Sequence, residues 1–206
     1  MEKPPNEVFC MQCGPGTAMD AQPSEGRLLC PRCGDQARLP ALPLFVVTGA
    51  SGVGKTTITD PLRRLLPRCL VFEADTTLHI VSLGWETWRD TWLHLVHAAG
   101  LNGYPVVLTG SLTPDQLERL PGRRLIGPIH FANLDCLDDI RAARLRARPA
   151  WRGTSTEAAI AQHQRYAAWL RAIIQPTFDS SAATPTEVAR QVADWVSALL
   201  PAEVAQ

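Results

Sequence analysis

The sequence predicts an α/β protein, a parallel sheet covered by helices and preceded by a small metal-binding segment. From about residue 43 onward, short apolar runs alternate with longer helical stretches, a pattern typical of parallel sheets. Before them stand two C-x-x-C pairs in a polar segment rich in glycine and proline. A glycine-rich loop directly after the first apolar run is the third observation, because such loops connect a strand to a helix.

The cysteine pairs have the spacing of a zinc site. Gly14 and Gly34 each follow a pair, which suits a tight turn that directs backbone N–H groups toward thiolate sulfurs. We therefore expect residues 1–38 to form a zinc ribbon; two disulfides or a thioredoxin-like pair are the alternative, which no βαβ pattern accompanies. The expected Zn²⁺ ligands are Cys10, Cys13, Cys30 and Cys33. A segment this small has no core of its own, so zinc would supply most of its folding energy.

A linker at 35–43 leads into the main domain, which we expect at 43–201. The expected strands are 42–48, 69–72, 105–108, 129–134 and a short one near 177–178. The expected helices are about 54–66, 84–100, 113–120, 156–174 and 185–200, and another that Asp135 or Asp138 opens and that ends near Arg148. Thr113 and Thr184 are suitable helix caps because each is followed by a proline at the first helical position.

Residues 49–56 read Gly-Ala-Ser-Gly-Val-Gly-Lys-Thr, a full G-x-x-x-x-G-K-[ST] phosphate-binding loop. Its glycines let backbone N–H groups approach phosphate oxygens, and the following helix directs its positive end at them. Lys55 is expected to reach the β- and γ-phosphates, and the Thr56 hydroxyl to bind Mg²⁺. The expected ligand is ATP or GTP; the alternative is a glycine-rich turn that binds nothing. The expected nucleotide contacts in this loop are Gly49, Ser51, Gly52, Val53, Gly54, Lys55, Thr56 and Thr57.

Charge and hydropathy exclude several classes of protein. The 206 residues carry 20 basic and 20 acidic side chains, which argues against nucleic-acid binding over the whole surface. No apolar run is long enough to span a membrane, and the N-terminus has no secretory signal. We expect a cytoplasmic protein, in which cysteines are metal ligands or buried thiols. Cys69 and Cys136 lie in apolar runs and fit the second description.

Over residues 43–200 the chain resembles the P-loop small-molecule kinases, the group of nucleoside-monophosphate, shikimate and gluconate kinases. The residues that carry this resemblance are the loop 49–56, the carboxylates Glu73 and Asp75 after the second strand, the arginine-rich segment 141–152 and the closing segment 178–188. The resemblance implies a P-loop NTPase fold, with a five-stranded parallel sheet and helices on both faces. It also implies transfer of the γ-phosphoryl group of ATP to a small acceptor at the carboxyl ends of the strands.

The resemblance also suggests roles for individual residues. Asp75 is expected to orient and deprotonate an acceptor hydroxyl, with Glu73 in reserve; a helix cap or a surface carboxylate is the alternative. Arg144 and Arg148 lie four residues apart and are expected to stabilise the transferring phosphoryl group, with Arg152 on a lid. A solvated basic helix face is the alternative for these arginines. Three tryptophans at helical spacing form either part of the core or a stacking wall for an aromatic acceptor. They are Trp85, Trp88 and Trp92.

One segment departs from the nucleoside-monophosphate kinases. They carry an Asp-Gly-Phe-Pro-Arg type segment after the third strand, where residues 109–112 here read Thr-Gly-Ser-Leu. Three functions therefore stay open. The first is a kinase for a nucleoside, nucleotide, sugar or other hydroxylated small molecule. The second is a nucleotide-dependent regulator whose ribbon docks a protein or a second copy of the chain, and the third is a nucleic-acid-end kinase, which the balanced charge does not favour.

Overall fold

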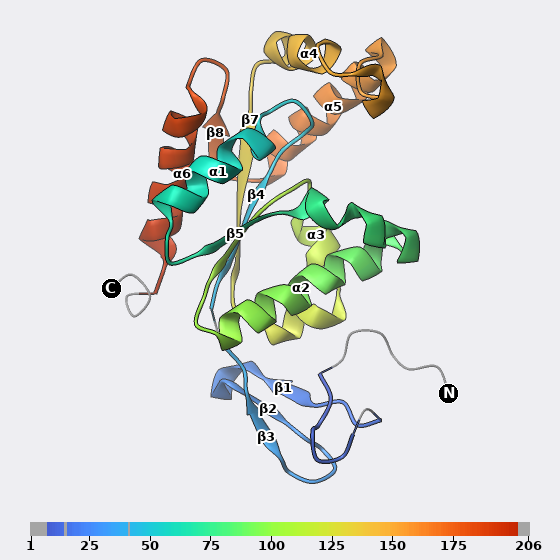
Figure 1. Cartoon of the computed structure of the whole chain (residues 1–206), viewed down its shortest axis with the longest axis vertical. Helices are drawn as coiled ribbons and strands as arrows, with labels where there is room; N and C mark the ends of the chain where they lie inside the picture. Colours follow the sequence, from blue (N-terminus) through green and yellow to red (C-terminus); the bar gives the residue numbers. More distant parts are fainter. Residues whose placement is uncertain (1–7, 15, 41, 202–206) are drawn as a thin grey trace. The chain divides into compact units, whose positions relative to one another are not determined.

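The computed structural model describes residues 8–14, 16–40 and 42–201, and its contacts divide the chain into two units. The first unit comprises Met1–Leu44, Ala74–Val106 and Thr113–Ile129. The second comprises Phe45–Glu73, Val107–Leu112 and His130–Gln206. Each unit therefore combines segments that are distant in the sequence, and each is described by itself (Figure 1).

A three-stranded antiparallel sheet forms the N-terminal part of the first unit. Its strands are β1 (Asp20–Gln22), β2 (Arg27–Leu29) and β3 (Gln36–Arg38), and the 3-10 turn η1 (Pro23–Glu25) joins the first two. Leu28, on the central strand, is fully buried, and so is Met19 just before β1. Few other apolar side chains are available here, which agrees with the expectation that this segment needs a metal to fold.

The rest of the first unit is helical. Its elements are η2 (Ala74–Leu83), α2 (Trp85–Leu101), the single-turn α3 (Pro114–Leu117) and η3 (Pro121–Leu125). Helix α2 packs against η3, where the buried Asp90 carboxylate accepts a 2.7 Å hydrogen bond from the Gly122 N–H. A Cβ at Gly122 would lie 2.8 Å from the same carboxylate, so only glycine allows this approach. Further along α2, His97 Nδ1 lies 3.0 Å from the Leu125 carbonyl oxygen.

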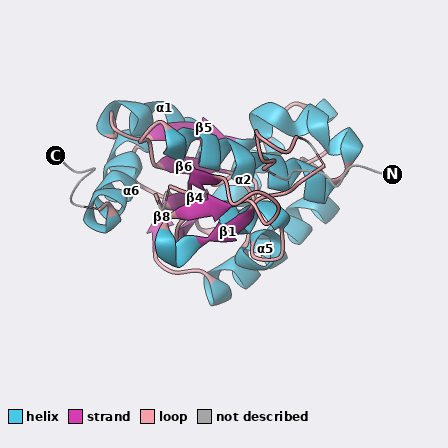
Figure 2. Ribbon diagram, turned by 90° about the horizontal axis from the view of Figure 1, so that it is seen from below, coloured by secondary structure: helices cyan, strands magenta, loops and turns pink. Residues whose placement is uncertain are grey.

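The second unit contains almost all of a five-stranded parallel sheet with helices around it. The strands are β4 (Leu44–Thr48), β5 (Leu70–Glu73), β6 (Val106–Thr109), β7 (Ile129–Asp135) and β8 (Thr177–Asp179). Their order across the sheet is β5-β6-β4-β7-β8, which places the strand that enters the phosphate loop at the centre (Figure 2). In the parallel pair of β7 and β8, Asp135 lies opposite Asp179, so both strands end on a carboxylate.

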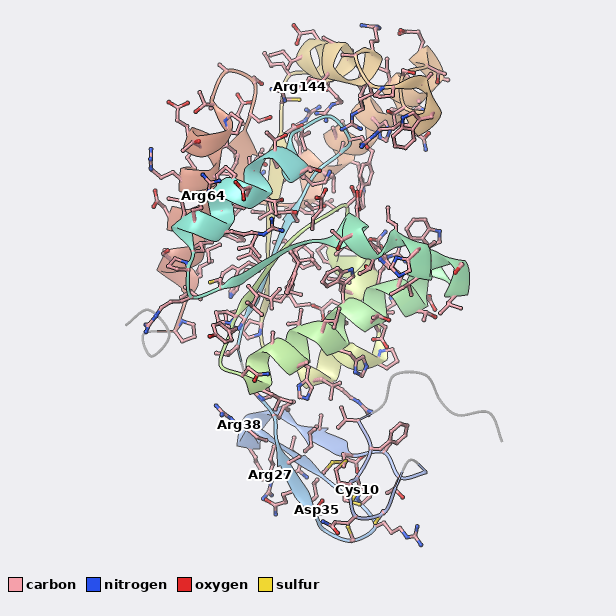
Figure 3. All side chains as sticks on the ribbon, in the orientation of Figure 1. Cys10, Arg27, Asp35, Arg38, Arg64 and Arg144 are labelled. Atoms are coloured by element: carbon pink, nitrogen blue, oxygen red, sulfur yellow. The ribbon has the colours of Figure 1, made fainter. Side chains whose placement is uncertain are left out.

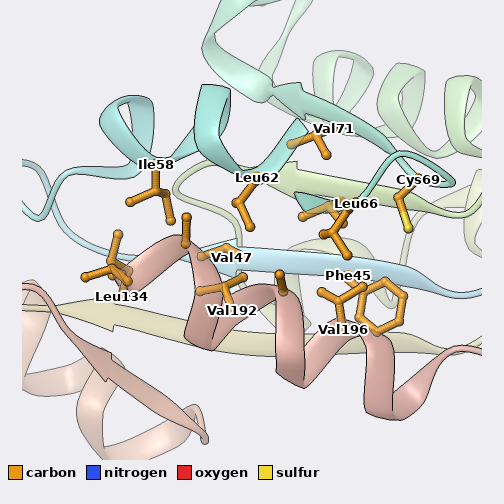
Figure 4. Close-up of a cluster of buried hydrophobic side chains, with 14 of the residues drawn as sticks. Phe45, Val47, Ile58, Leu62, Leu66, Cys69, Val71, Leu134, Val192 and Val196 are labelled. Atoms are coloured by element: carbon orange, nitrogen blue, oxygen red, sulfur yellow. The ribbon is translucent and has the colours of Figure 1, made fainter. Parts of the chain in front are cut away.

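Helices α1 (Lys55–Leu65) and α6 (Pro185–Leu199) pack against each other beside this sheet. Ile58 and Leu62 of α1 meet Val192 and Val196 of α6 over Phe45 of the central strand (Figure 4). All five are buried, which fixes the start of α1, and hence the phosphate loop, on the sheet. The remaining helical elements of the unit are α4 (Asp138–Arg146), the short η4 (Ala150–Arg152) and α5 (Glu157–Ile173).

The expected strands and most expected helices are present, with differences of one or two residues at their ends. Two helices are shorter than predicted. The helix expected over 113–120 is the single turn α3, and α4 ends at Arg146 rather than near residue 148. The Thr184 cap forms a full capping box with Glu187. Among the described residues, no helix has the length and apolar character that crossing a membrane requires.

Candidate active site

The phosphate loop lies between β4 and α1 and has little room for a side chain at Gly49 or Gly52. A Cβ at Gly49 would lie 2.4 Å from the Leu134 carbonyl oxygen and 2.9 Å from a Val53 methyl carbon. Gly52 has a φ of 92°, and a Cβ there would lie 3.3 Å from side-chain carbons of Arg141 and Leu145 on α4. The loop is therefore held between β7 and α4, and packing favours glycine at Gly49 and Gly52, whereas a Cβ at Gly54 would meet no atom within 4 Å.

Lys55 and Thr56 occupy the first turn of α1, where the sequence pattern places them. The Lys55 ammonium donates hydrogen bonds to the carbonyl oxygens of Gly49, at 2.5 Å, and Ala50, at 3.2 Å, so it lies over the loop. The Gly49 carbonyl also accepts a 3.1 Å bond from the Ser111 hydroxyl after β6. These bonds hold the ammonium group where phosphates would meet the loop amides.

Glu73 faces the same position from the end of β5. The Thr56 hydroxyl donates a hydrogen bond to the Glu73 carboxylate. A hydroxyl and a carboxylate side by side are the hard oxygen donors that Mg²⁺ prefers, so this pair fits the ion that the loop implies. Glu73 could therefore hold the ion together with Thr56, whereas the sequence placed it in reserve behind Asp75 as the base that deprotonates the acceptor. Asp75 lies in the first turn of η2 in the first unit with an exposed side chain, and its role as base stays a prediction.

Arg144 of α4 ties the phosphate loop to the segment after β8 (Figure 3). Its guanidinium donates to the Gly52 carbonyl at 3.3 Å, to the Ser180 hydroxyl at 3.1 Å and to the Ser180 carbonyl at 2.7 Å. The buried Ser180 hydroxyl in turn donates to the Val53 carbonyl at 2.8 Å. Arg144 therefore makes several structural contacts at the loop, and its catalytic role stays a prediction.

A cavity of about 320 Å³ opens beside the loop. It is lined by Gly52, Val53, Gly54, Thr57, Ile58, Arg144, Arg148, Ser180, Ala183, Pro185 and Val188. Its walls are mainly apolar, with two guanidinium groups at one side, and it adjoins the loop amides. This combination suits a planar base next to a chain of phosphates.

Arg148 and Arg152 lie beyond the end of α4. Arg148 lines the cavity, and burial lowers the pKa of its guanidinium, with a further lowering from the nearby Arg152. Arg152 is exposed at the end of η4, and its guanidinium lies over the ring of the exposed Trp151, 5.1 Å from the ring centre. The two arginines thus lie in one short segment of which Arg148 lines the cavity, and their role on a lid stays a prediction.

A buried ion cluster lies under the loop at the end of β7. Arg141 has no exposed surface; it forms an ion pair with Asp135 and donates a 3.0 Å bond to the Cys136 carbonyl. Arg171 of α5 donates to the other oxygen of Asp135 at 2.7 Å. Within the arginine-rich segment 141–152, Arg141 is therefore structural, and Asp135 links β7, α4 and α5.

The stripe of tryptophans divides between core and surface. Trp88 and Trp92 are buried, each 3% exposed, whereas Trp85 is 53% exposed with Arg89 over its ring. The Trp88 indole N–H donates to the Thr77 hydroxyl at 2.9 Å, which satisfies its polar group inside the first unit. Trp88 and Trp92 are therefore core residues, and Trp85 alone of the three has a largely exposed ring.

The four N-terminal cysteines form one cluster. Their sulfurs all lie within 4.8 Å of one another, with Cys10–Cys33 at 3.6 Å and Cys13–Cys30 at 3.9 Å. A tetrahedral site with Zn–S bonds of about 2.3 Å places its sulfurs about 3.8 Å apart, so the cluster has the right size for zinc. Gly14 and Gly34 have positive φ angles and close the two turns, with Gly14 N–H bonded to the Cys10 carbonyl at 2.9 Å. Cys10 also lies near Asp35 at one side of the cluster (Figure 3).

Comparisons with known proteins bear on the fold. No protein-family model matches the chain, and no curated protein matches it. Solved structures do. The tunicamycin resistance protein of Deinococcus radiodurans matches 75% of this chain and 95% of its own, with a TM-score of 0.59 and 21% identity. An unliganded sugar kinase from a Janibacter species matches 80% and 99%, with a TM-score of 0.54 and 21% identity.

A shikimate kinase from Acinetobacter baumannii, solved with shikimate, matches 78% of this chain and 96% of its own, at a TM-score of 0.53 and 16% identity. The chain therefore has the fold of the P-loop small-molecule kinases, with a four-cysteine cluster before it that can hold a metal ion.

The structure adds site residues that the sequence pattern did not single out. Ser111 bonds the Gly49 carbonyl, and Asp135 and Arg171 anchor α4 and α5, yet each is an ordinary polar residue in the sequence.

Proposed function

We propose that this protein transfers the γ-phosphoryl group of ATP to a hydroxyl or phosphate of a small molecule. The observation that carries the proposal is the contact between the Thr56 hydroxyl and the Glu73 carboxylate beside the phosphate loop. A carboxylate from β5 beside this threonine supplies an anionic oxygen for the Mg²⁺ that phosphoryl transfer requires. The kinase-like fold supports the same reaction, since its solved relatives include sugar and shikimate kinases.

The chain's own residues supply most of what the reaction needs. The loop amides and Lys55 would hold the β- and γ-phosphates, and the cavity lined by Ile58 and Arg148 would hold the base. Thr56 and Glu73 would bind Mg²⁺, which neutralises charge on the phosphates. Arg148 and Arg152 would stabilise the negative charge that spreads over the phosphoryl oxygens and keep water out.

Asp75 would orient the acceptor hydroxyl and accept its proton in this mechanism. It follows Glu73 by two residues, at the point where β5 gives way to η2. An exposed carboxylate at the end of a strand can reach an acceptor without first breaking a buried contact. We therefore assign metal binding to Glu73 and proton transfer to Asp75, and a comparison of the two alanine variants separates these roles.

ATP is the better candidate for the donor. Guanine presents two N–H donors that proteins commonly bind with a carboxylate, whereas none of the described residues that line the cavity is acidic. The Ser180 hydroxyl is already engaged by Val53 and Arg144. An apolar slot with few free polar groups is suited to adenine, which can be held largely by packing.

The zinc ribbon is the second part of the proposal. Zn²⁺ held by four thiolates gives a centre of net negative charge, while the ribbon's arginines are largely balanced by its acidic residues; Arg27, for instance, pairs with Glu25. This charge does not favour a nucleic-acid strand. A structural role, or contact with a protein or a second copy of the chain, therefore suits the ribbon better.

The experiment is a measurement of ADP release from ATP and Mg²⁺ with a panel of acceptors: nucleosides, nucleoside monophosphates, sugars, hydroxylated antibiotics and a 5′-hydroxyl oligonucleotide. We expect one class to stimulate release strongly and the Lys55→Ala variant to lose that stimulation while staying folded. Tight nucleotide binding with no stimulation by any class would refute the proposal and favour a nucleotide-dependent regulator.

A further inference from the structure

His163 lies on the face of α5 that packs against α4, beside three buried apolar residues and the polar Gln164, whose amide donates to the Asp138 carbonyl at 3.3 Å. Ile160, Ala167 and Leu170 are 2%, 1% and 0% exposed, at spacings that place them on one side of the helix. Position 163 lies on the same side, one turn after Ile160 and one turn before Ala167. Even partial burial of a polar ring costs free energy unless a hydrogen-bond partner compensates for it.

The face that carries His163 is directed at α4 and the phosphate loop. Ile160 packs with Ala142 and Leu145 of α4, and Leu145 lies directly under Gly52 of the loop. Two turns after His163 on the same helix, Arg171 is bonded to Asp135 at the end of β7. Both ends of this face are therefore fixed to the elements that carry the loop, and His163 lies between them.

The charges around His163 belong to the phosphate-binding apparatus. Burial lowers the pKa of its imidazole, and the nearby cations Arg148, Lys55 and Arg141 lower it further, in that order. The described charges that act on the ring are these three; Lys55 comes from the start of α1, and the two arginines from α4 and the residues after it. The imidazole is thus neutral among cations, although it lies near the ammonium group that the loop aims at phosphates.

Within the described part of the chain, neither ring nitrogen of His163 has a hydrogen-bond partner, and the residue is only half-buried. A neutral imidazole has one N–H donor and one acceptor nitrogen. The ring therefore has its hydrogen-bonding capacity free, inside a group of cations that would attract an anion. This differs from His97 of the first unit, whose nitrogen is engaged by a backbone carbonyl.

We propose that His163 is a further catalytic residue, whose ring N–H donates a hydrogen bond to the transferring phosphoryl group of the bound nucleotide. The inference rests on the proposed kinase function and adds a donor that neither the loop pattern nor the arginines of the lid supply. The negative charge of the bound triphosphate opposes the field of the three cations. Nucleotide binding should therefore favour the protonated ring, with uptake of a proton from solvent.

The first test is kinetic. His163→Gln keeps a hydrogen-bond donor of similar reach, whereas His163→Ala removes it. We expect kcat to fall about 10-fold to 100-fold in the alanine variant, with partial recovery in the glutamine variant and little change in the KM for ATP. Gln162→Ala, an exposed neighbour on α5, is the matched control and should retain wild-type kcat. Wild-type kcat in His163→Ala would overturn the inference.

The second test does not depend on turnover. The imidazole nitrogen resonances of the wild-type protein are titrated with and without a non-hydrolysable ATP analogue and Mg²⁺, and the His163 signal is assigned from its absence in His163→Gln. We expect its pKa to rise when the analogue binds, and no response of its signal would refute the contact. Failure of every acceptor with the wild-type enzyme would refute the kinase proposal instead, and this titration would still decide whether His163 contacts the nucleotide.

Discussion

Replacing Arg144 by alanine should loosen the phosphate loop. The change removes bonds of 3.3 Å to the Gly52 carbonyl and of 3.1 and 2.7 Å to Ser180. A hydrogen bond to a charged group contributes about 1.5–3 kcal/mol when buried. Arg144 is half-exposed and two of its bonds go to one residue, so we expect a total loss of about 2–3 kcal/mol.

Thermal unfolding of the whole chain measures this loss. For a chain of this size, 1 kcal/mol corresponds to about 2–4 °C, so the Tm of Arg144→Ala should fall by about 4–12 °C. Calorimetric titration should show weaker binding of the ATP analogue, by about 10-fold, because the Gly52–Val53 segment is no longer held in its binding geometry. Addition of the analogue should recover part of the lost Tm through binding.

Arg146→Ala is the matched control, since Arg146 is an arginine of the same helix in a surface ion pair with Glu157 at 2.8 Å. Such exposed pairs contribute about 0–1 kcal/mol, so this variant should unfold close to wild type. An Arg144→Ala variant that unfolds and binds nucleotide like the control would refute the reasoning. A loss of kcat alone, with Tm and affinity unchanged, would instead assign Arg144 the catalytic role that the sequence predicts.

The remaining predictions concern the metals and pH. Glu73→Gln should raise the Mg²⁺ concentration needed for half-maximal turnover, because it removes a charged oxygen next to Thr56, whereas the same requirement in the variant and the wild type would exclude Glu73 as a ligand. Purified protein should contain one zinc ion per chain by elemental analysis, and Cys30→Ser should release it and unfold the ribbon, while Cys69→Ala should keep it; metal-free protein with a folded ribbon would contradict the zinc site. Burial, partly opposed by the Leu125 carbonyl, lowers the pKa of His97, so the unfolded chain binds the proton more readily and stability should fall as the pH drops through about 6.5. His97→Gln should flatten this dependence in denaturant titrations between pH 7 and 5, and an unchanged slope would refute the assignment.

The parts of the site that could be predicted from the sequence are those whose geometry depends on residues close together in the chain. The spacing of Gly49, Gly54, Lys55 and Thr56 is fixed by one loop and one helical turn, so a pattern of eight residues specifies it. The cysteine pairs are readable for the same reason, since each turn and its glycine is a local unit. The capping box at Thr184 likewise involves residues only three apart.

Contacts between residues that are distant in the sequence could not be predicted in the same way. Glu73 reaches Thr56 only because β5 ends beside the start of α1, and an equally plausible carboxylate, Asp75, stands two positions later in the sequence. Arg141 and Arg144 belong to the same basic run. The sequence assigned a role to Arg144 and none to Arg141, but it did not show that the structure buries Arg141 against Asp135 and directs Arg144 at the loop. Helix periodicity places residues on a face, but the neighbouring elements decide what that face meets.

The sequence by itself determined the chain's local chemistry: a phosphate-binding loop after a buried strand, four thiols in two tight turns, and alternating strands and helices that favour a parallel sheet. Tertiary structure alone decided the long-range partners. The sheet order β5-β6-β4-β7-β8 sets which strand ends surround the loop. Packing of α4 and α5 decides that Arg141 is buried and that His163 lies among Lys55 and two arginines. The physical reason is range: turns and caps depend on atoms a few residues apart, whereas burial and electrostatic fields depend on neighbours that only the completed fold supplies.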